Sequence, residues 1–143
     1  MGVTQATTVS DELVAAFERL IPQLSASARP PTRAELEKII SSSETTVLLA
    51  WSDEGEITGS LTLVVFRIPT GARAWIEDVV VDEAARGQGV GQALVDEAIR
   101  LASEAGARTV DLTSRPSREA ANTLYEKAGF RARETNVFRY DLS

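Results

Sequence analysis

A glycine-rich loop between a predicted strand and a predicted helix is the segment of this sequence best suited to bind an anion. Residues 86–91 read Arg-Gly-Gln-Gly-Val-Gly, and an apolar helical pattern begins at Val90. The first N–H groups of a helix lack partners within the helix, and the helix dipole favours negative charge there. Glycine spacing alone is a weak signal, so an ordinary loop with a helix cap is the alternative interpretation.

Two established phosphate-binding patterns do not fit this loop. The P-loop pattern requires Gly-Lys-Ser/Thr, and the loop has no lysine. The dinucleotide pattern G-x-G-x-x-G places its third glycine at Gln92 when counted from Gly87, and at Leu94 when counted from Gly89. In that pattern the glycines follow the strand directly, whereas here residues Asp82–Arg86 intervene. A nucleotide-binding module is therefore disfavoured.

The absence of two residue types limits the chemistry further. The chain has no His and no Cys, so Ser-His-Asp and Cys-His mechanisms and disulfides are excluded. A metal site is not expected either, because histidine is the commonest metal ligand and cysteine is the other main zinc ligand. Acid–base chemistry must therefore use Asp, Glu, Tyr, Lys or ordered water.

Two adjacent acids lie in the predicted strand that precedes the loop. Side chains alternate along a strand, so Glu77 and Asp78 are expected on opposite faces. The same alternation gives Glu77 an apolar setting, because Trp75, Val79 and Val81 fall nominally on its face.

Residues 75–130 resemble the GNAT superfamily of N-acetyltransferases. The stretch WIEDVVVDEAARGQGVGQALVDEAI is similar to the acetyl-CoA-binding core of that family, whose Gln/Arg-x-x-Gly-x-Gly/Ala pattern is matched by Arg86, Gly89 and Gly91. The later stretch REAANTLYEKAGF resembles the helix that follows in the family. Residues 1–70 match the family only in their order of secondary structure.

The resemblance implies acetyl-CoA as cosubstrate and assigns residues to it. In the family the pyrophosphate lies on the glycine-rich loop, and the pantetheine arm pairs with the backbone of the preceding strand. The valine side chains of that strand suit a core role equally well. The implied cofactor-binding residues are Val79, Val80, Val81, Arg86, Gly87, Gln88, Gly89, Val90, Gly91, Gln92 and Asn122.

The resemblance also implies two catalytic residues. Glu77 is assigned as the general base that takes a proton from the amine, directly or through water, and Tyr125 as the acid that protonates the leaving thiolate. A structural alternative stays open for each assignment. For Glu77 it is an ion pair with Arg73 or another arginine. For Asn122 and Tyr125, which share a helix face, it is packing of that face on the sheet. Asp78 is given a structural or substrate-orienting role.

The elements that position these residues follow from hydrophobic periodicity and caps. Ser10 caps a first helix, Thr32 with Glu35 caps a second, and a third begins at Val90 and ends before Gly106. Ser117 caps a fourth helix, Ser117–Ala128. The order βααβββαβαββ predicts a mixed α/β (α+β) GNAT fold with about seven strands, namely Val3–Val9, Thr45–Asp53, Ile57–Ile68, Arg73–Val81, Thr109–Thr113, Phe130–Arg133 and Asn136–Asp141.

Length and composition set the remaining expectations. The 143 residues predict a single domain over residues 1–143, and neither a signal peptide nor a membrane span is expected, so the predicted location is the cytoplasm. The formal net charge of −6 argues against nucleic acid as a partner. A homodimer is expected from the exposed edge that the C-terminal strands would form.

The sequence thus predicts acetyl transfer from acetyl-CoA to a primary amine of a small molecule or peptide, by direct attack in a ternary complex. A cysteine acyl-enzyme is impossible in this chain, which agrees with direct attack. The alternative is a non-catalytic acyl-CoA-binding or regulatory module on the same fold, which keeps the loop without needing Glu77 or Tyr125. The strand sequence IEDVVV also resembles that of acetyltransferases acting on amino-sugar phosphates and aminophosphonates.

Overall fold

A computed structural model describes all 143 residues, which form two compact units, residues 1–113 and 114–143. The first unit contains every strand and three of the four α-helices. The single domain expected over residues 1–143 stays a prediction. The elements in chain order are β1 (Gly2–Gln5), α1 (Asp11–Leu24), α2 (Arg33–Ser41), β2 (Thr45–Trp51), β3 (Ile57–Ile68), β4 (Gly71–Val81), the 3₁₀ turn η1 (Glu83–Ala85), α3 (Val90–Glu104), β5 (Val110–Asp111) and α4 (Glu119–Lys127).

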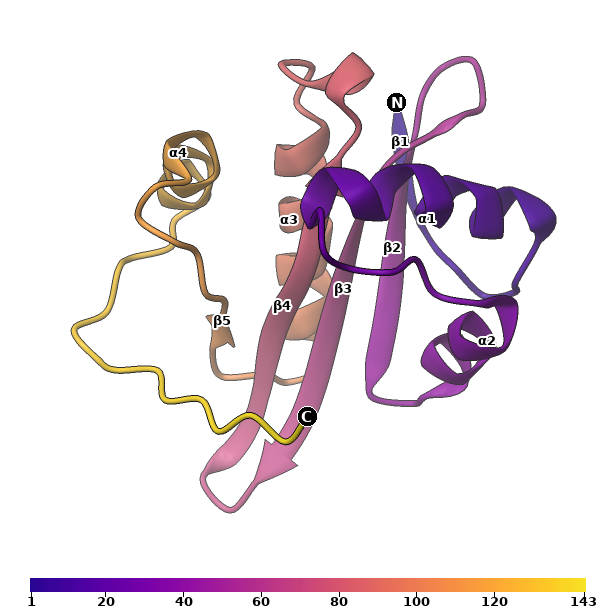
Figure 1. The fold of residues 1–143 in the computed structure, drawn as a ribbon. Coiled ribbons are helices and arrows are strands. Elements are labelled where there is room, and N and C mark those ends of the chain that lie inside the picture. Colours follow the sequence, from indigo (N-terminus) through magenta and orange to yellow (C-terminus); the bar gives the residue numbers. More distant parts are fainter. The chain divides into compact units, whose positions relative to one another are not determined.

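The first unit is built on one five-stranded sheet with the order β1-β2-β3-β4-β5 (Figure 1). Strands β1 to β4 pair antiparallel. Short turns join β2 to β3 and β3 to β4, whereas α1 and α2 lie between β1 and β2. Strand β5 pairs parallel with β4, and α3 makes the crossover between them. The mixed α/β class is confirmed.

Helices cover both faces of this sheet (Figure 1). Helices α1 and α2 pack on one face, where Leu20 and Leu36 join Val47, Leu49 and Val80 in a continuous core. Helix α3 lies on the opposite face and buries its apolar stripe there. The larger apolar side chains of the sheet and of α3 that are fully enclosed are Leu48, Leu61, Leu63, Leu94 and Val95.

The helices of the first unit begin and end where local signals predict. The Ser10 hydroxyl accepts from Leu13 N over 3.1 Å, and Thr32 forms a complete capping box with Glu35. Helix α3 ends before Gly106, whose φ of 79° is the left-handed value that glycine adopts readily. No helix is long and apolar enough to cross a bilayer.

The second unit corrects two expectations. The closing strands predicted at Phe130–Arg133 and Asn136–Asp141 are absent, so the sheet has five strands instead of about seven. A segment with alternating apolar residues forms a strand only when a neighbouring strand pairs with its backbone N–H and C=O groups. No strand pairs with this segment, and its side chains Val137, Phe138 and Tyr140 are 70–90% exposed. Helix α4 starts later than predicted, at Glu119, and no side chain caps it.

Candidate functional site

Strand β4 contains a β-bulge at the point where the sequence places its two acids. Thr62 pairs with Glu77 and Ser60 pairs with Val80, so two residues of β4 lie opposite one residue of β3. One of the two is Asp78, whose φ of 50° is left-handed, a conformation that Asp and Asn tolerate better than most side chains. The structure thus gives Asp78 a backbone role in bending the strand.

The bulge changes which side chains share a face with Glu77. Directly paired residues lie on one face of a sheet, and Glu77 pairs through Thr62 with Val47, a core residue under α1 and α2. Beyond the bulge, Val80 joins that same core, whereas Val81 pairs with Gly59 on the α3 face. The expectation that Val79 and Val81 line the face of Glu77 is therefore wrong, because the extra residue reverses the alternation.

Glu77 is exposed and carries one clear hydrogen bond. The Trp75 indole Nε1 donates to Glu77 Oε2 over 2.6 Å, as side chains two residues apart on one strand face allow. The ion pairs of the structure do not include Glu77. The carboxylate is therefore held by an indole and open to solvent, without the enclosing apolar setting that alternation predicts.

The backbone of β4 is unpaired on one side beyond Trp75. Strand β5 pairs with Ala74 and Trp75 only, while β3 continues to pair as far as Val81. The edge of β4 from Ile76 to Val81 therefore has no neighbouring strand on the β5 side. An extended ligand can add to such an edge by hydrogen bonding to the backbone, which is the role predicted for Val79–Val81.

The glycine-rich loop follows this edge after residues 82–85, which include η1. Gly87 and Gly89 have φ values of 79° and 80°, and a Cβ on either would meet open space. Gly89 is the N-cap of α3 and supplies no side chain, so the first N–H groups of that helix have no side-chain partner. These features suit a phosphate, because Gly87 and Gly89 present no side chain to block its approach and the first N–H groups of a helix favour an anion.

The other predicted residues around the loop differ in their exposure to solvent. Arg86 is 57% exposed and lies 4.0 Å from Glu83, so its guanidinium is available to an anion. Gln88 is exposed and Gly91 half-buried, whereas Val90 is buried and anchors α3. Gln92 is half-buried and donates to Asp96 over 2.8 Å, within its own helix.

The second unit contains the remaining two predicted residues, Asn122 and Tyr125, on α4. The Asn122 amide donates to the Arg115 carbonyl over 3.1 Å. The Tyr125 ring is buried and packs edge-on against Phe130, with centroids 6.0 Å apart. Burial raises the pKa of the Tyr125 hydroxyl and outweighs the opposing effect of Arg118, so the phenol keeps its proton.

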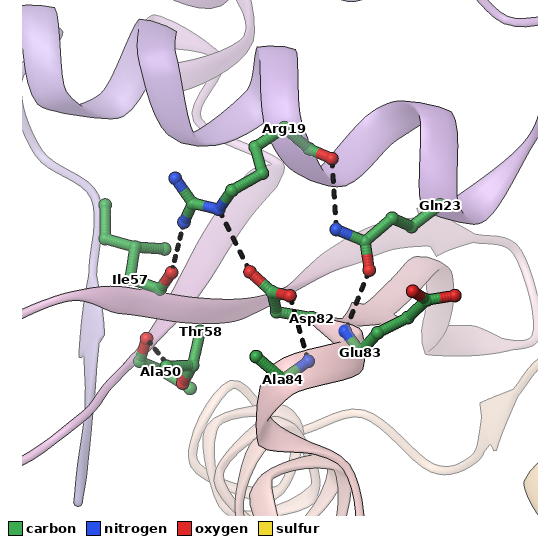
Figure 2. Close-up of polar contacts among 8 residues, drawn as sticks. All are labelled: Arg19, Gln23, Ala50, Ile57, Thr58, Asp82, Glu83 and Ala84. Carbon is green, nitrogen blue, oxygen red and sulfur yellow. Dashed lines mark hydrogen bonds and ion pairs between the residues drawn. The ribbon is translucent and has the colours of Figure 1, made fainter.

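Four residues that no motif in the sequence marks lie between β4 and the loop or bond to the residues there. Figure 2 shows Arg19 and Gln23 of α1 bonded to Asp82 and Glu83, immediately after β4. Partial burial raises the pKa of Asp82, but hydrogen bonds from Ala84 N and Arg19, together with the positive charge of Arg19, outweigh it and hold that pKa below its ordinary value. No sequence signal marks these residues, since the partners lie 63 and 60 positions apart.

Comparison with known families places this fold and its glycine-rich loop in a family. The profile of the acetyltransferase (GNAT) family matches residues 11–130. This chain belongs to that family.

Particular relatives extend the comparison. The chain is 41% identical over 91 residues to a glucosamine 6-phosphate N-acetyltransferase of Trypanosoma brucei brucei, a match that covers 62% of this chain and 59% of that protein. It is 46% identical over 55 residues to a probable glucosamine 6-phosphate N-acetyltransferase 2 of Oryza sativa subsp. japonica, covering 38% and 31%. The chain therefore spans less than two thirds of the length of these curated relatives.

A solved structure supports the fold. A putative acetyltransferase from Agrobacterium tumefaciens superposes with a TM-score of 0.87 at 24% identity, covering 99% of this chain and 100% of that one. At that level of identity the likeness concerns the fold.

Proposed function

We propose that this protein transfers an acetyl group from acetyl-CoA to a primary amine by direct attack in a complex with both substrates. The observation that carries the proposal is the loop at residues 86–91, with its two left-handed glycines and uncapped helix, in a chain of the acetyltransferase (GNAT) family. In the reaction the amine nitrogen bonds to the acetyl carbon, the carbon–sulfur bond breaks, and the thiolate leaves.

The residues of the first unit fit the donor. Acetyl-CoA supplies an activated thioester and carries a pyrophosphate and a long amide-containing arm. The free donors at Gly89 and the start of α3 suit the pyrophosphate, and the guanidinium of Arg86 adds positive charge nearby. The unpaired edge of β4 suits the amide groups of the arm.

Two side chains are proposed for proton transfer. Glu77 accepts a proton from the amine, because an amine must lose its positive charge before it attacks, and the Trp75 indole holds one carboxylate oxygen while leaving the group open to substrate or water. Tyr125 donates a proton to the departing thiolate, and its raised pKa agrees with a group that stays protonated until that step.

For the acceptor, we propose an amino-sugar phosphate. The support is the pair of curated relatives, both described as glucosamine 6-phosphate N-acetyltransferases, and the first of them aligns over 91 residues. The acidic strand sequence around Glu77 suits a cationic amine.

The decisive experiment is an acceptor screen with acetyl-CoA and detection of released thiol. The chain has no cysteine, so the protein itself contributes no thiol to the signal, and a reaction without amine measures hydrolysis of the thioester. Glucosamine 6-phosphate is tested beside glucosamine, glucose 6-phosphate and a peptide with a free N-terminus. We expect turnover with the phosphorylated amino sugar, a higher KM without the phosphate, and no reaction without the amine.

The outcomes separate enzyme from binding module. Turnover with another amine alone retains the acetyltransferase and rejects the amino-sugar phosphate. Tight binding of acetyl-CoA with no acetylated amine in the screen favours the non-catalytic acyl-CoA-binding module.

A further inference from the structure

The loop that follows β4 starts with hydrogen bonds to two side chains of α1 (Figure 2). Arg19 Nε donates to Asp82 Oδ2 over 3.0 Å, and Arg19 Nη2 donates to the Ile57 carbonyl over 2.5 Å. One helical turn later, Gln23 Oε1 accepts from the Glu83 backbone N–H over 2.8 Å. We call this set of bonds from Arg19 and Gln23 the α1 clamp.

The partners of the clamp are themselves held in place. The Gln23 amide donates back to the Arg19 carbonyl over 3.2 Å, which fixes its rotamer. The second oxygen of Asp82 caps the η1 turn by accepting from Ala84 N over 3.1 Å. The Asp82 N–H donates to the Thr58 carbonyl over 2.8 Å, which ties the same residue to β3. Asp82 therefore joins α1, β3 and the start of the loop.

The loop has no comparable anchor farther along. Gly87 and Gly89 have no side chains, and the loop's next charged contact, between Arg86 and Glu83, is a loose 4.0 Å. The buried residues that follow the clamp are Ala85, at the end of η1, and Val90, at the start of α3. The position of residues 86–89 therefore depends on the two ends, the η1 turn held by the α1 clamp and Val90.

The clamp also balances charge. Asp82 is ionised at neutral pH, and an unpaired carboxylate at the start of a loop that receives a pyrophosphate would repel it. The Asp82 side chain is only 18% exposed, so water screens its charge incompletely. The Arg19 guanidinium is the group that neutralises it.

We infer that Arg19 and Gln23 are positioning residues for the acetyl donor, holding the start of the loop in place and neutralising Asp82 so that the glycine-rich segment is ready to bind the pyrophosphate. This inference rests on the proposed function. It assigns to α1 a role in donor binding that acts through the loop and requires no contact with the donor.

The test compares Arg19→Met and Gln23→Met with the matched control Arg33→Met in the full chain. Arg33, like Arg19, is 46% exposed and bonds one carboxylate, that of Asp11, and one backbone carbonyl, that of Val9. Its partners lie at the beginning of α1 and not at the loop. The readouts are the Kd of acetyl-CoA by calorimetry, and KM and kcat with the amine found in the acceptor screen.

We expect Arg19→Met to raise the Kd and KM for acetyl-CoA about tenfold, as expected for loss of a charged hydrogen bond, with kcat at saturation unchanged. Gln23→Met should raise the Kd and KM for acetyl-CoA by a smaller factor. It tests the inference if Arg19→Met does not fold. Arg33→Met leaves both at the parent values. Arg19→Met combined with Asp82→Asn has no higher KM than Arg19→Met alone, because the two residues act as a pair.

Parent-like Kd values in both clamp variants overturn the inference, as does an equal rise in Arg33→Met, which would indicate a general structural effect. If the parent itself does not bind acetyl-CoA, the proposed function fails, and the inference fails with it.

Discussion

Residues 1–113 and residues 114–143 differ sharply in packing. Every buried hydrophobic side chain except Tyr125 belongs to the first unit, where two helix layers enclose the sheet. The second unit has one helix and an irregular C-terminal segment whose Val137, Phe138, Tyr140 and Leu142 are 70–92% exposed. Hydrophobic burial is the main stabilising contribution to folding, so most of the stability belongs to the first unit.

The proposed chemistry is divided between these units. The loop and Glu77 belong to the first, and Tyr125 belongs to the second. A variant in the core of the first unit should therefore affect stability above all, whereas conservative changes of Glu77 and Tyr125 should affect turnover with little change in stability.

The largest effect is expected for Glu77→Gln. Loss of a direct general base lowers kcat by roughly 10²–10⁴-fold, and the loss shrinks as pH rises because more of the amine is unprotonated. The melting temperature should not change, since the carboxylate is exposed and forms no ion pair. The control is Glu54→Gln, an exposed acid in the turn between β2 and β3. A parent-like pH–rate profile in Glu77→Gln removes this residue from the mechanism.

Gly89→Glu should reduce acetyl-CoA affinity by at least about a hundredfold, since it places a carboxylate where phosphate is proposed to bind. At a hundredfold excess over the parent's Kd the parent gains about 2.7 kcal/mol of stability from the ligand, and the variant should gain no more than about 0.4 kcal/mol. Gly55→Glu is a close control, because Gly55 has a φ of 81° and equally open surroundings in a turn between β2 and β3. Equal affinity in the two variants would reject the loop as the binding site.

Leu48→Ala and Phe138→Ala test the packing contrast directly. Leu48 is 0% exposed in the first unit, and a Leu→Ala change at such a site costs about 2–5 kcal/mol of unfolding free energy. Phe138 is 90% exposed in the second unit, so its truncation should cost less than about 0.5 kcal/mol. Urea titration measures both. A comparable cost for Phe138→Ala would show that the C-terminal segment is packed in solution.

Tyr125→Phe should lower kcat about tenfold, less than Glu77→Gln. A thiol has a pKa of about 8.5, so a departing thiolate needs less assistance than a protonated amine does. Raising the pH should not restore the rate, because the missing group is a proton donor. Circular dichroism melting should give the parent temperature, since the ring that packs on Phe130 is retained. Rescue at high pH would contradict the acid role.

The smallest effect concerns acid stability. The folded-state pKa of Asp82 lies below its unfolded value, so this residue stabilises the fold above about pH 4 and the stabilisation is lost as pH falls through the lower, folded-state pKa. Asp82→Asn should therefore flatten the decline in melting temperature below pH 4 while retaining the cap on Ala84. If the melting temperature of Asp82→Asn falls below pH 4 as steeply as that of the parent, Asp82 does not contribute to acid unfolding.

Local signals allowed much of the fold to be predicted from the sequence. Ser10, Thr32 and Gly106 mark helix ends through bonds and torsions within a few residues, and the structure places them as predicted. The meander of β2, β3 and β4 was predictable because each strand carries its own apolar pattern and each turn its own residues. The loop before α3 was predictable for the same reason.

The features that alternation and spacing did not reveal depend on partners distant in sequence. The bulge at Asp78 exists only in the register between β3 and β4, so no pattern within β4 discloses it. The α1 clamp joins residues 63 and 60 positions apart. The segment Asn136–Asp141 has a strand-like pattern, but no strand pairs with it. Alternation within a segment cannot distinguish a paired strand from an unpaired one.

The hydrogen bond between Trp75 and Glu77 gives the protein an internal optical reporter. The chain has two tryptophans, so Trp51→Phe leaves Trp75 as the only indole. Because its Nε1 lies 2.6 Å from the carboxylate oxygen, the fluorescence of that single indole should change when Glu77 gains or loses its proton, or when an amine approaches the carboxylate. The ionisation state of the proposed base is thus open to direct spectroscopic titration in the resting protein, with no need for turnover.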